Sequence, residues 1–551
     1  MTPLVSASAV VAGPIRAALE FQAPSIDYRA VAPMLIVFGA AVLAVLVEAF
    51  VPRYYRLGVQ VTLAGLATLG GLAAVALQAI TGEPLETGGV ARSGSTVVGS
   101  VVVDFPALFL QGTILALALV AVVGMADHSV DEGGPFAPQA SAVPGSNAEA
   151  AARRAGLVQT EVFPLLLFSV GGMLLFPASN DLLTMFVALE VFSLPLYLMC
   201  GLARRRRLLS QEASMKYFLL GAFSSAFFLY GTAMLYGFAG SVRLADIAAA
   251  IDGSGPGGTS VMHKEGLLLL GVAMLVVGLL FKVSAAPFHL WTPDVYQGAP
   301  TPVTGFMAAC TKVAAFGALL RVAYVAVPGI RWDWQPALWG VAILTMLVGS
   351  VVAIVQTDVK RMLAYSSIAH AGFLMTGVLA MDKTGVSGVL FYLAAYGFTT
   401  LGAFALIGLV RDSGDEGVVG GEATHLSQWS GLGRRHPLVA ALFSLFLLSF
   451  AGIPLTSGFM GKFAVFSAAV AHGGWVLALI GVLASAIAAF FYVRVIVLMY
   501  FREPTGAQAV VADAGLGTMF AVMMATAVTV ILGVAPSLLL DPATSASVFL
   551  P

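Results

Sequence analysis

The chain has 551 residues, of which 59% are hydrophobic and only 10% are charged, and its formal net charge is −1. Soluble domains carry roughly 25% charged residues, so this composition excludes a water-soluble globular protein and indicates a membrane protein. The near-neutral charge offers no basic field to attract nucleic acid. Two cysteines are too few for a four-thiolate iron–sulfur site.

Apolar runs divide the chain into about fourteen predicted transmembrane helices, because crossing ~30 Å of hydrocarbon needs about 20 residues. Residues 1–30 contain Pro3, Pro14 and Pro24 and are predicted to be an extramembrane N-terminal extension. The predicted spans are residues 33–52, 58–80, 102–125, 162–178, 182–203, 212–239, 266–286, 302–325, 336–356, 362–381, 385–410, 437–471, 476–501 and 516–540.

The breaks between spans suggest a grouping. Spans 1–3 lie within residues 31–125, and a Pro/Ala/Gly-rich stretch at 126–160 is predicted to be a flexible cytoplasmic linker. Spans 4–8 lie within 161–325, spans 9–13 within 335–501, and span 14 is residues 516–540. The predicted fold class is therefore an all-α polytopic membrane protein.

The positive charges in the predicted loops favour one orientation. With the N-terminus outside, the cytoplasmic loops hold about twice as many lysines and arginines as the outside segments, as membrane proteins generally do. The run Arg204–Arg207 contributes much of this bias. We therefore predict both termini outside and an even number of helices.

A few basic residues fall inside or at the ends of apolar runs. A charge at the centre of a span costs at least ~2.5–3.5 kcal/mol, so such a residue usually faces the bundle interior and has a function. Arg321 lies near the end of its span and is expected to extend its charged group toward water. The basic residues that the loops do not account for are Lys216, Lys282, Lys312, Arg321, Lys462 and Arg494.

Glu190 and Lys312 are the deepest of the predicted intramembrane charges. Glu190 lies ~13 Å along a helix from Asp181, and Lys312 lies ~15 Å beyond Pro302, so both are near the bilayer centre. A structural ion pair or a packing role is the alternative for each. We favour a role in transport because of their depth.

Lys282 and Lys462 both lie in apolar runs too long for one straight span. The run around Lys282 would reach ~42 Å, so we expect Pro287 to break the helix. The run around Lys462 would reach ~50 Å, and Gly452, Pro454 and Gly458 are expected to interrupt it. Interrupted helices indicate transport sites, because unwound backbone is tolerated only against protein or water. The alternative is a lysine that merely packs or caps at a break.

Three further residues are weaker candidates. Lys216 lies near the start of its helix, where its ammonium can also reach the membrane surface. His289 and His370 fall in apolar stretches, where a histidine is as often a hydrogen-bonded core residue as a functional one.

Lysine and glutamate together suit proton movement. A lysine in water stays charged to a pH of about 10.4, but burial can lower that pKa by several units and a nearby carboxylate raises it again. A buried lysine beside a mobile partner can therefore bind and release a proton near neutral pH.

At these residues the sequence resembles the antiporter-like membrane subunits of respiratory complex I, which share a fold with Mrp-type cation/proton antiporter subunits. The strongest segment is FKVSAAPFHLWTPDVYQGAPTPVTGFMAACTKVAAFG at 281–317, in which PDVYQGAP followed by Lys312 resembles the subunit N branch. Further matches are EVFSLPLY at 190–197, EASMKYF at 212–218, DVKRMLAYSSIAHAGF at 358–373 and AGIPLTSGFMGKF at 451–463.

The resemblance implies two inverted five-helix repeats, spans 4–8 and 9–13, with broken helices at spans 7 and 12. It implies that Glu190 and Lys282 form a coupled pair and that Lys312 is the central lysine. Lys462 matches the exit-side lysine, and Lys216 matches a secondary channel lysine. His289 and His370 match polar positions along the same axis.

The resemblance also implies a setting. The chain would be a multi-pass subunit of NADH:quinone oxidoreductase in a bacterial plasma (inner) membrane, with no catalytic, cofactor-binding or metal site of its own. Flavin, iron–sulfur clusters and quinone would reside in partner subunits. Its membrane partners would be the antiporter-like subunits M and L and the small subunits K, J, A and H.

Two rival readings remain. One is a Mrp-type cation/proton antiporter subunit, which the YQG sequence and Lys312 disfavour. The other is a structural membrane scaffold with buried ion pairs, which would lose little by using apolar residues instead.

Overall fold

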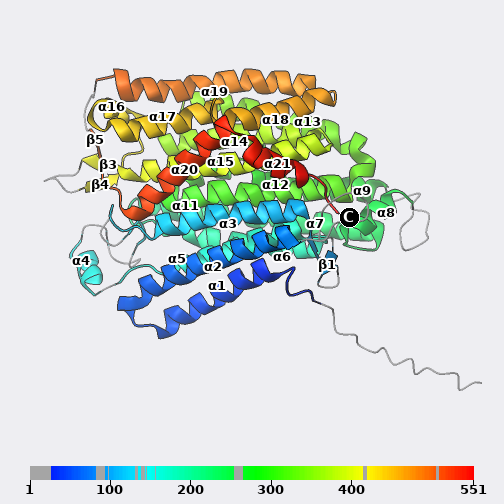
Figure 1. The fold of residues 1–551 in the computed structure, drawn as a ribbon, viewed down its shortest axis with the longest axis horizontal. Helices are drawn as coiled ribbons and strands as arrows, with labels where there is room; N and C mark the ends of the chain where they lie inside the picture. Colours follow the sequence, from blue (N-terminus) through cyan, green and yellow to red (C-terminus); the bar gives the residue numbers. More distant parts are fainter. Residues whose placement is uncertain are drawn as a thin grey trace, which may run out of the picture.

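The computed structural model describes residues 26–81, 94–96, 99–130, 134–137, 143, 146–155, 157–253, 265–413, 419–503 and 508–550. In this part of the chain, twelve helices are long and apolar enough to cross a membrane, and three shorter apolar helices accompany them. The long helices run side by side as a bundle (Figure 1). The predicted all-α polytopic fold is confirmed, and each of the predicted spans is helical along most of its length. Most of the predicted N-terminal extension lies outside the described residues.

The N-terminal part of the bundle consists of three helices and a hairpin. Its elements are α1 (Ala32–Phe50), α2 (Arg53–Thr81), β1 (Gly94–Thr96), β2 (Val101–Val103) and α3 (Phe105–Met125). Strands β1 and β2 pair antiparallel, and the Asp104 side chain then caps α3 by accepting a hydrogen bond from the Ala107 amide at 3.0 Å. Within the predicted linker 126–160, the helix α4 (Asn147–Arg154) carries Glu149, which forms an ion pair with Arg204 at 2.8 Å.

The segment predicted as spans 4–8 contains two long, regular helices and two interrupted ones. Its elements are α5 (Val162–Leu175), η1 (Phe176–Ala178), α6 (Leu182–Cys200), α7 (Arg207–Ala239), α8 (Leu244–Ile251), α9 (Glu265–Val283), α10 (Trp291–Gly298), α11 (Thr301–Phe306), η2 (Met307–Thr311), α12 (Lys312–Arg321), η3 (Val322–Ala326) and η4 (Pro328–Ile330). The two turns η2 and η3 are π-helical, and they continue α11 and α12 as one rod.

The segment predicted as spans 9–13, together with the last span, also combines long helices with an interrupted one. Its elements are α13 (Arg331–Ile354), α14 (Val359–Leu379), α15 (Lys383–Leu409), β3 (Val410–Ser413), β4 (Val419–Glu422), η6 (Leu426–Trp429), α16 (Leu432–Arg435), α17 (Pro437–Ala451), α18 (Ser457–Ala471), α19 (Trp475–Phe501), β5 (Ala509–Val511), α20 (Leu516–Val534) and α21 (Ser537–Ser545). Strand β3 lies between β4 and β5 and pairs antiparallel with both.

The two ends of the bundle differ. The sheet β4-β3-β5 and α4 lie at one end, at the left of Figure 1, whereas β1, α8 and the C-terminus lie at the other. The start of α1 is at the same end as the C-terminus.

Both predicted helix breaks are present, and Pro287 in the first and Gly452 in the second lie within the unwound segments, as expected. Helix α9 already ends at Val283, before Pro287. Helix α17 ends at Ala451, where Gly452 adopts a left-handed φ of 83°. Gly458 lies not in the break but in the first turn of α18, where a Cβ would come within 1.9 Å of the Ser449 carbonyl oxygen. Glycine is therefore required at 458 by a close helix approach.

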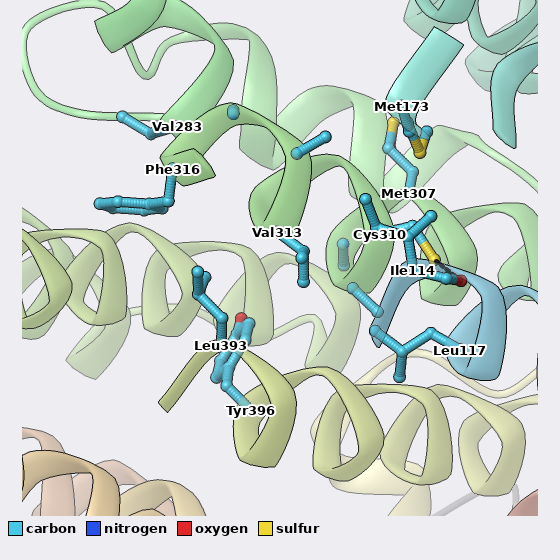
Figure 2. Close-up of a cluster of buried hydrophobic side chains, with 14 of the residues drawn as sticks. Ile114, Leu117, Met173, Val283, Met307, Cys310, Val313, Phe316, Leu393 and Tyr396 are labelled. Atoms are coloured by element: carbon cyan, nitrogen blue, oxygen red, sulfur yellow. Dashed lines mark hydrogen bonds between the residues drawn. The ribbon is translucent and has the colours of Figure 1, made fainter. Parts of the chain in front are cut away.

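Three helical rods form the centre of the molecule. The rod Thr301–Ala326 is 100% buried over its most apolar window, α14 is 94% buried and α15 is 89% buried. Figure 2 shows α3, α5 and α15 packing side chains against this rod, around Cys310. The central rods are shielded from lipid, so a lysine on one of them faces protein.

Candidate functional site

Lys282 is buried one residue before the end of α9 and points at α6. Its Nζ donates hydrogen bonds to Ser193 Oγ at 2.7 Å and to Tyr197 Oη at 3.3 Å. Four aromatic rings, of Phe192, Tyr197, Tyr217 and Phe281, lie 5.2 to 5.7 Å from the ammonium. Faces of aromatic rings attract cations, so the pocket accommodates the charged form without a carboxylate in direct contact.

Glu190 lies one helical turn from Ser193 on the same face of α6. It acts electrostatically on both Lys282 and Tyr197. Its Oε1 is buried and has no hydrogen-bond partner among the described residues. Glu190 and Lys282, both described, form no ion pair within 4.0 Å. Instead, the Ser193 hydroxyl, one turn from Glu190, receives the hydrogen bond from Lys282.

Lys216 is much closer to the surface than the other lysines. Its side chain is 41% exposed, and its Nζ forms ion pairs with Glu212 and with Asp294, each at 2.6 Å. Asp294 also pairs with Arg361 at 2.5 Å. The structure therefore places Lys216 in a half-exposed chain of alternating charges that begins in α7 and ends in α14.

His289 lies in the unwound segment between α9 and α10. It is buried, its ring centroid is 6.5 Å from that of Tyr365, and its Nδ1 has no hydrogen-bond partner among the described residues. A buried ring nitrogen without a partner is costly in a static structure, and a water molecule would relieve it.

Lys312 is the first residue of α12, in the fully buried central rod. Its side chain is 2% exposed, and its Nζ donates to the Ser367 carbonyl oxygen on α14 at 2.6 Å. The Tyr396 ring of α15 lies 5.4 Å from the same nitrogen. The preceding residues Met307–Thr311 form a π-helical turn, a feature often found at functional sites.

His370 lies one helical turn beyond Ser367 on the same face of α14. Its Nδ1 is 2.7 Å from Tyr392 Oη and its Nε2 is 3.4 Å from Tyr492 Oη. Both ring nitrogens therefore reach hydroxyls that can exchange protons with them.

Lys462 occupies the second helix break. Its Nζ donates to the carbonyl oxygens of Phe450 at 2.8 Å and Ala451 at 3.0 Å, and to Ser485 Oγ at 2.7 Å. The two carbonyls are among the unpaired ones at the C-terminal end of α17, where the helix dipole favours a cation. The Phe373 ring, one turn beyond His370, lies 4.9 Å from the ammonium.

One face of α14 connects two of the buried lysines. Ser367 contacts Lys312, His370 follows one turn later, and Phe373 contacts Lys462 after another turn. Residues spaced three apart share a helix face, so these groups form one stripe. The structure thus brings together the central lysine, the histidine and the lysine of the second break. It places Lys282 with Glu190 in a separate cluster against α6.

Two basic residues lie elsewhere than the sequence suggested. Arg321 does not reach water: its side chain is 0% exposed and pairs with Asp104 at 2.7 Å. The carboxylate of Asp104, which comes from another span, compensates the charge in place of solvent. Lys360, which the predicted span 362–381 leaves in a cytoplasmic loop, is 1% exposed in the first turn of α14 and pairs with Glu422 at 3.3 Å.

Sequence reasoning missed Glu422 because it follows a Gly-rich loop with no apolar periodicity. Burial alone would raise the pKa of its carboxyl, but Lys360 and Arg411 outweigh this and lower the pKa to about 2. The carboxylate therefore stays ionised at neutral pH. The sequence offered one indication, the basic residue Lys360 in the run Val359–Arg361. This run is the first turn of α14 and not the end of a loop, so the buried lysine needs a carboxylate partner.

The arrangement can bind and transfer protons. Its residues are amines, carboxylates, hydroxyls and imidazoles in the buried interior of the bundle. In the described residues, no group of three or more His, Cys, Asp or Glu side chains is placed to hold a metal ion.

Comparisons with known proteins show which proteins the chain is similar to. Residues 179–488 match the model of the family described as NADH:quinone oxidoreductase/Mrp antiporter, TM. NADH-quinone oxidoreductase subunit N of Beutenbergia cavernae is 60% identical over 96% of this chain and 100% of that protein. Subunit N 3 of Streptomyces griseus is 58% identical over 96% of each chain.

Two solved structures share the fold. A chain of respiratory complex I from Thermus thermophilus is 32% identical, has a TM-score of 0.71, and is matched over 94% of this chain and all of that one. A chain of the Mrp complex from a Dietzia species has a TM-score of 0.76 over 95% of this chain and 97% of that one, at 20% identity. At this identity the second likeness concerns the fold alone.

Proposed function

This chain belongs to the NADH:quinone oxidoreductase/Mrp antiporter family, and from that membership we propose that it is the proton-translocating subunit N of a bacterial respiratory NADH-quinone oxidoreductase. The observation that carries the proposal is the set of three lysines, Lys282, Lys312 and Lys462, each at most 5% exposed in the interior of an apolar bundle. A charge so deep in a membrane protein is retained for function.

In the proposed mechanism, protons pass between buried groups that lie at similar depth. Lys282 receives a proton while Glu190 stabilises its ammonium form. Lys312 holds the next proton, and His370 with its tyrosine neighbours passes it to Lys462 at the second break. Each step breaks one N–H or O–H bond and forms another, so charge moves without any covalent intermediate.

The remaining candidates have supporting roles. Lys216, which matches the family's secondary channel lysine, lies with its partner Asp294 at the half-exposed edge of the first cluster. His289 accepts or donates at its unpartnered nitrogen beside the first helix break.

The energy for this movement comes from outside the chain. NADH oxidation would take place in partner subunits that hold flavin, iron–sulfur clusters and quinone, and this subunit would carry no redox site itself. The partners would be subunits M and L and the small membrane subunits K, J, A and H. The site would be the bacterial plasma membrane, with both termini and β1 outside and the β4-β3-β5 sheet in the cytoplasm.

Purification of the native assembly tests the proposal. We expect the assembly that contains this chain to hold flavin, to oxidise NADH with quinone, and to acidify one side of a proteoliposome during turnover. An assembly without flavin that exchanges sodium for protons would instead identify a Mrp-type antiporter subunit.

A further inference from the structure

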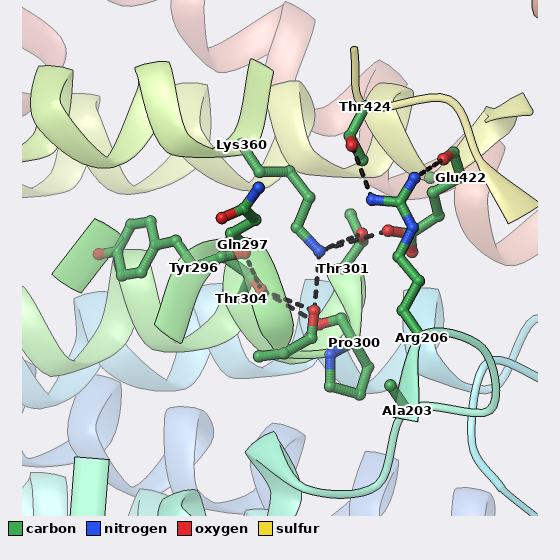
Figure 3. A network of polar contacts seen from close by, with 12 residues as sticks. Ala203, Arg206, Tyr296, Gln297, Pro300, Thr301, Thr304, Lys360, Glu422 and Thr424 are labelled. Atoms are coloured by element: carbon green, nitrogen blue, oxygen red, sulfur yellow. Dashed lines mark hydrogen bonds and ion pairs between the residues drawn. The ribbon is translucent and has the colours of Figure 1, made fainter. Parts of the chain in front are cut away.

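The ion pair between Lys360 and Glu422 lies where a hollow at the sheet-bearing end of the bundle meets the buried core. Figure 3 shows the two side chains meeting there, with Arg206 beside them. The Glu422 side chain is 19% exposed, whereas that of Lys360 is 1% exposed. Glu422 is thus the partner nearer to solvent, and Lys360 is the first buried group behind it.

The hollow gives this pair contact with the surroundings. Lys360, Glu422 and the segment Gln297–Pro300 line it, together with Arg205 and the exposed Arg206. Arg206 donates to Thr424 Oγ1 at 2.7 Å and to the Glu422 carbonyl oxygen at 2.9 Å, which fixes the strand that carries the carboxylate. Water in the hollow can therefore approach the pair without crossing an apolar layer.

On the side facing the core, Lys360 is hydrogen-bonded to the start of the central rod. Its Nζ donates to the Ala299 carbonyl oxygen at 2.7 Å and to Thr301 Oγ1 at 3.1 Å. Thr304, one turn further into the rod, bonds the same Ala299 carbonyl at 3.5 Å and that of Tyr296 at 3.3 Å. These contacts are drawn in Figure 3.

A second set of polar contacts begins at the hydroxyl of Tyr296 and lies beside the central lysine. Tyr296 Oη is 3.5 Å from Ser367 Oγ, and the Ser367 carbonyl accepts from Lys312 Nζ at 2.6 Å. Lys360 and Ser367 are seven residues apart on α14, so they share a helix face and are ~10 Å apart along its axis. The stripe on α14 that joins Lys312 to His370 therefore extends outward to Lys360.

We propose that Lys360 is a further proton-carrying residue, through which protons enter from the hollow and reach Lys312. This inference rests on the proposed function and adds an entry route separate from the Glu190–Lys282 cluster. Lys360 suits the role because of its position: it lies between the hollow and the start of the central rod, beside the Glu422 carboxylate.

The proton balance of one passage is simple. The Lys360 ammonium loses one N–H proton inward along the hydroxyls and intervening water, and neutral Lys312 gains one N–H bond. Water in the hollow then delivers a proton to neutral Lys360, which recovers its pair with Glu422. The net change is one proton moved from the hollow to Lys312, driven by the redox chemistry of the partner subunits.

The substitution Lys360→Arg separates a carrier from a structural ion pair. Arginine keeps the charge and the contact with Glu422 but does not release its proton in proteins. We expect the assembled complex with Lys360→Arg to lose NADH-driven proton uptake into inverted vesicles, down to the level of Lys312→Ala. Lys383→Arg is the matched control, because it makes the same change at an exposed lysine at the opposite end of the bundle, and it should pump normally.

A second variant covers the possibility that arginine does not fit. Lys360→Gln combined with Glu422→Gln removes both charges of the pair, so neither is left buried without the other. Native gels would verify that the complex assembles. It too should fail to pump. Normal pumping by either assembled variant would overturn the role of Lys360, whereas loss of pumping in Lys312→Ala beside it would show that the proposed function itself still stands.

Discussion

At the residue scale, each buried charge is stabilised differently. Lys282 contacts hydroxyls and aromatic faces, Lys312 contacts one carbonyl and one ring, and Lys462 contacts the C-terminal end of a half-helix. None of these three lysines, all within the described residues, has a carboxylate within ion-pair distance. Hydroxyls and ring faces stabilise an ammonium less than a carboxylate does, so the neutral form of each amine remains within reach.

Lys282 hydrogen-bonds to Ser193 and not to Glu190, so a substitution of Glu190 should change the charge near Lys282 without breaking its hydrogen bonds. Because the carboxylate acts at a distance, Glu190→Gln removes the charge that stabilises the Lys282 ammonium form while leaving its hydrogen bonds in place. We expect NADH-driven pumping to fall severalfold. Glu190→Asp keeps the charge and should retain part of the activity.

Rates of pumping in inverted vesicles, normalised to assembled complex, measure both variants. Equal activity of Glu190→Gln and wild type would mean that the carboxylate has no electrical role in this cluster.

Glu190, Lys282, Lys312 and Lys462 could be identified from the sequence as buried charges, because each lies inside a long apolar run. A charge in such a run is costly, so it indicates a functional residue. Ion-pair partners far apart in sequence were not foreseeable. Asp104 compensates Arg321 from 217 residues away, and no local pattern links the two. Lys360 was assigned to a loop because a charged run at a span boundary looks the same whether its side chains face water or protein.

At the element scale, interruptions in the helices bring side chains to the site. The breaks after Val283 and Ala451 and the π-helical turn before Lys312 each lie next to a buried lysine. The two breaks could be predicted, because their apolar runs exceed the thickness of a membrane. The π-helical turn left no signal, since an extra residue in a turn changes neither composition nor periodicity over so short a distance.

The close approach of α18 to the end of α17 gives a stability prediction. Gly458→Ala places a Cβ within 1.9 Å of the Ser449 carbonyl oxygen, so one helix must shift, at a cost of about 1–3 kcal/mol or more. Thermal unfolding of the purified complex should show a lower midpoint. Gly340→Ala in α13 is the control, because nothing lies within 4 Å of its new Cβ; equal losses in the two variants would contradict the close approach.

The strand β4 gives a prediction about pH. The pKa of Glu422 is lowered from 4.5 to about 2, so its pair with Lys360 contributes stability fully above pH 4.5 and loses it as pH falls toward 2. Hydrogen exchange of the β4 amides, corrected for intrinsic rates, should therefore be constant from pH 8 to pH 5 and accelerate in more acidic buffer. In Glu422→Gln the amides should exchange faster from pH 8 to pH 5, where the carboxylate of the unaltered chain is ionised. An onset of acceleration near neutral pH in the unaltered chain would show that the pair is weaker than its geometry indicates.

At the scale of the whole molecule, the C-terminal residues pack at Arg321, near the end of the central rod. Arg321 pairs with Asp104 of the α3 cap, donates to the Pro177 carbonyl oxygen at 2.6 Å, and lies 5.0 Å from the Phe549 ring. The Leu550 amide in turn donates to Asp104 at 3.2 Å. The C-terminal residues thus close a contact among elements that are distant in sequence.

Breaking this contact on one side should be costly. Arg321→Met leaves the Asp104 carboxylate buried and unpaired, which destabilises a protein by about 3–5 kcal/mol. Adding Asp104→Asn removes the unpaired charge while an amide still caps α3, so the double variant should recover part of the loss. Thermal midpoints of the four forms give the coupling, and additive losses would mean that the pair is not energetically linked.

The proton-carrying role of the buried lysines is tested most directly at Lys312. The measurement is NADH-driven proton uptake by the assembled complex in inverted vesicles, with Cys310→Ala as a control two residues away in the same buried rod. Lys312→Ala should lower uptake at least about tenfold with assembly unchanged, while Cys310→Ala pumps normally. Normal uptake by an assembled Lys312→Ala complex would contradict the account, because the central lysine would then be a packing residue.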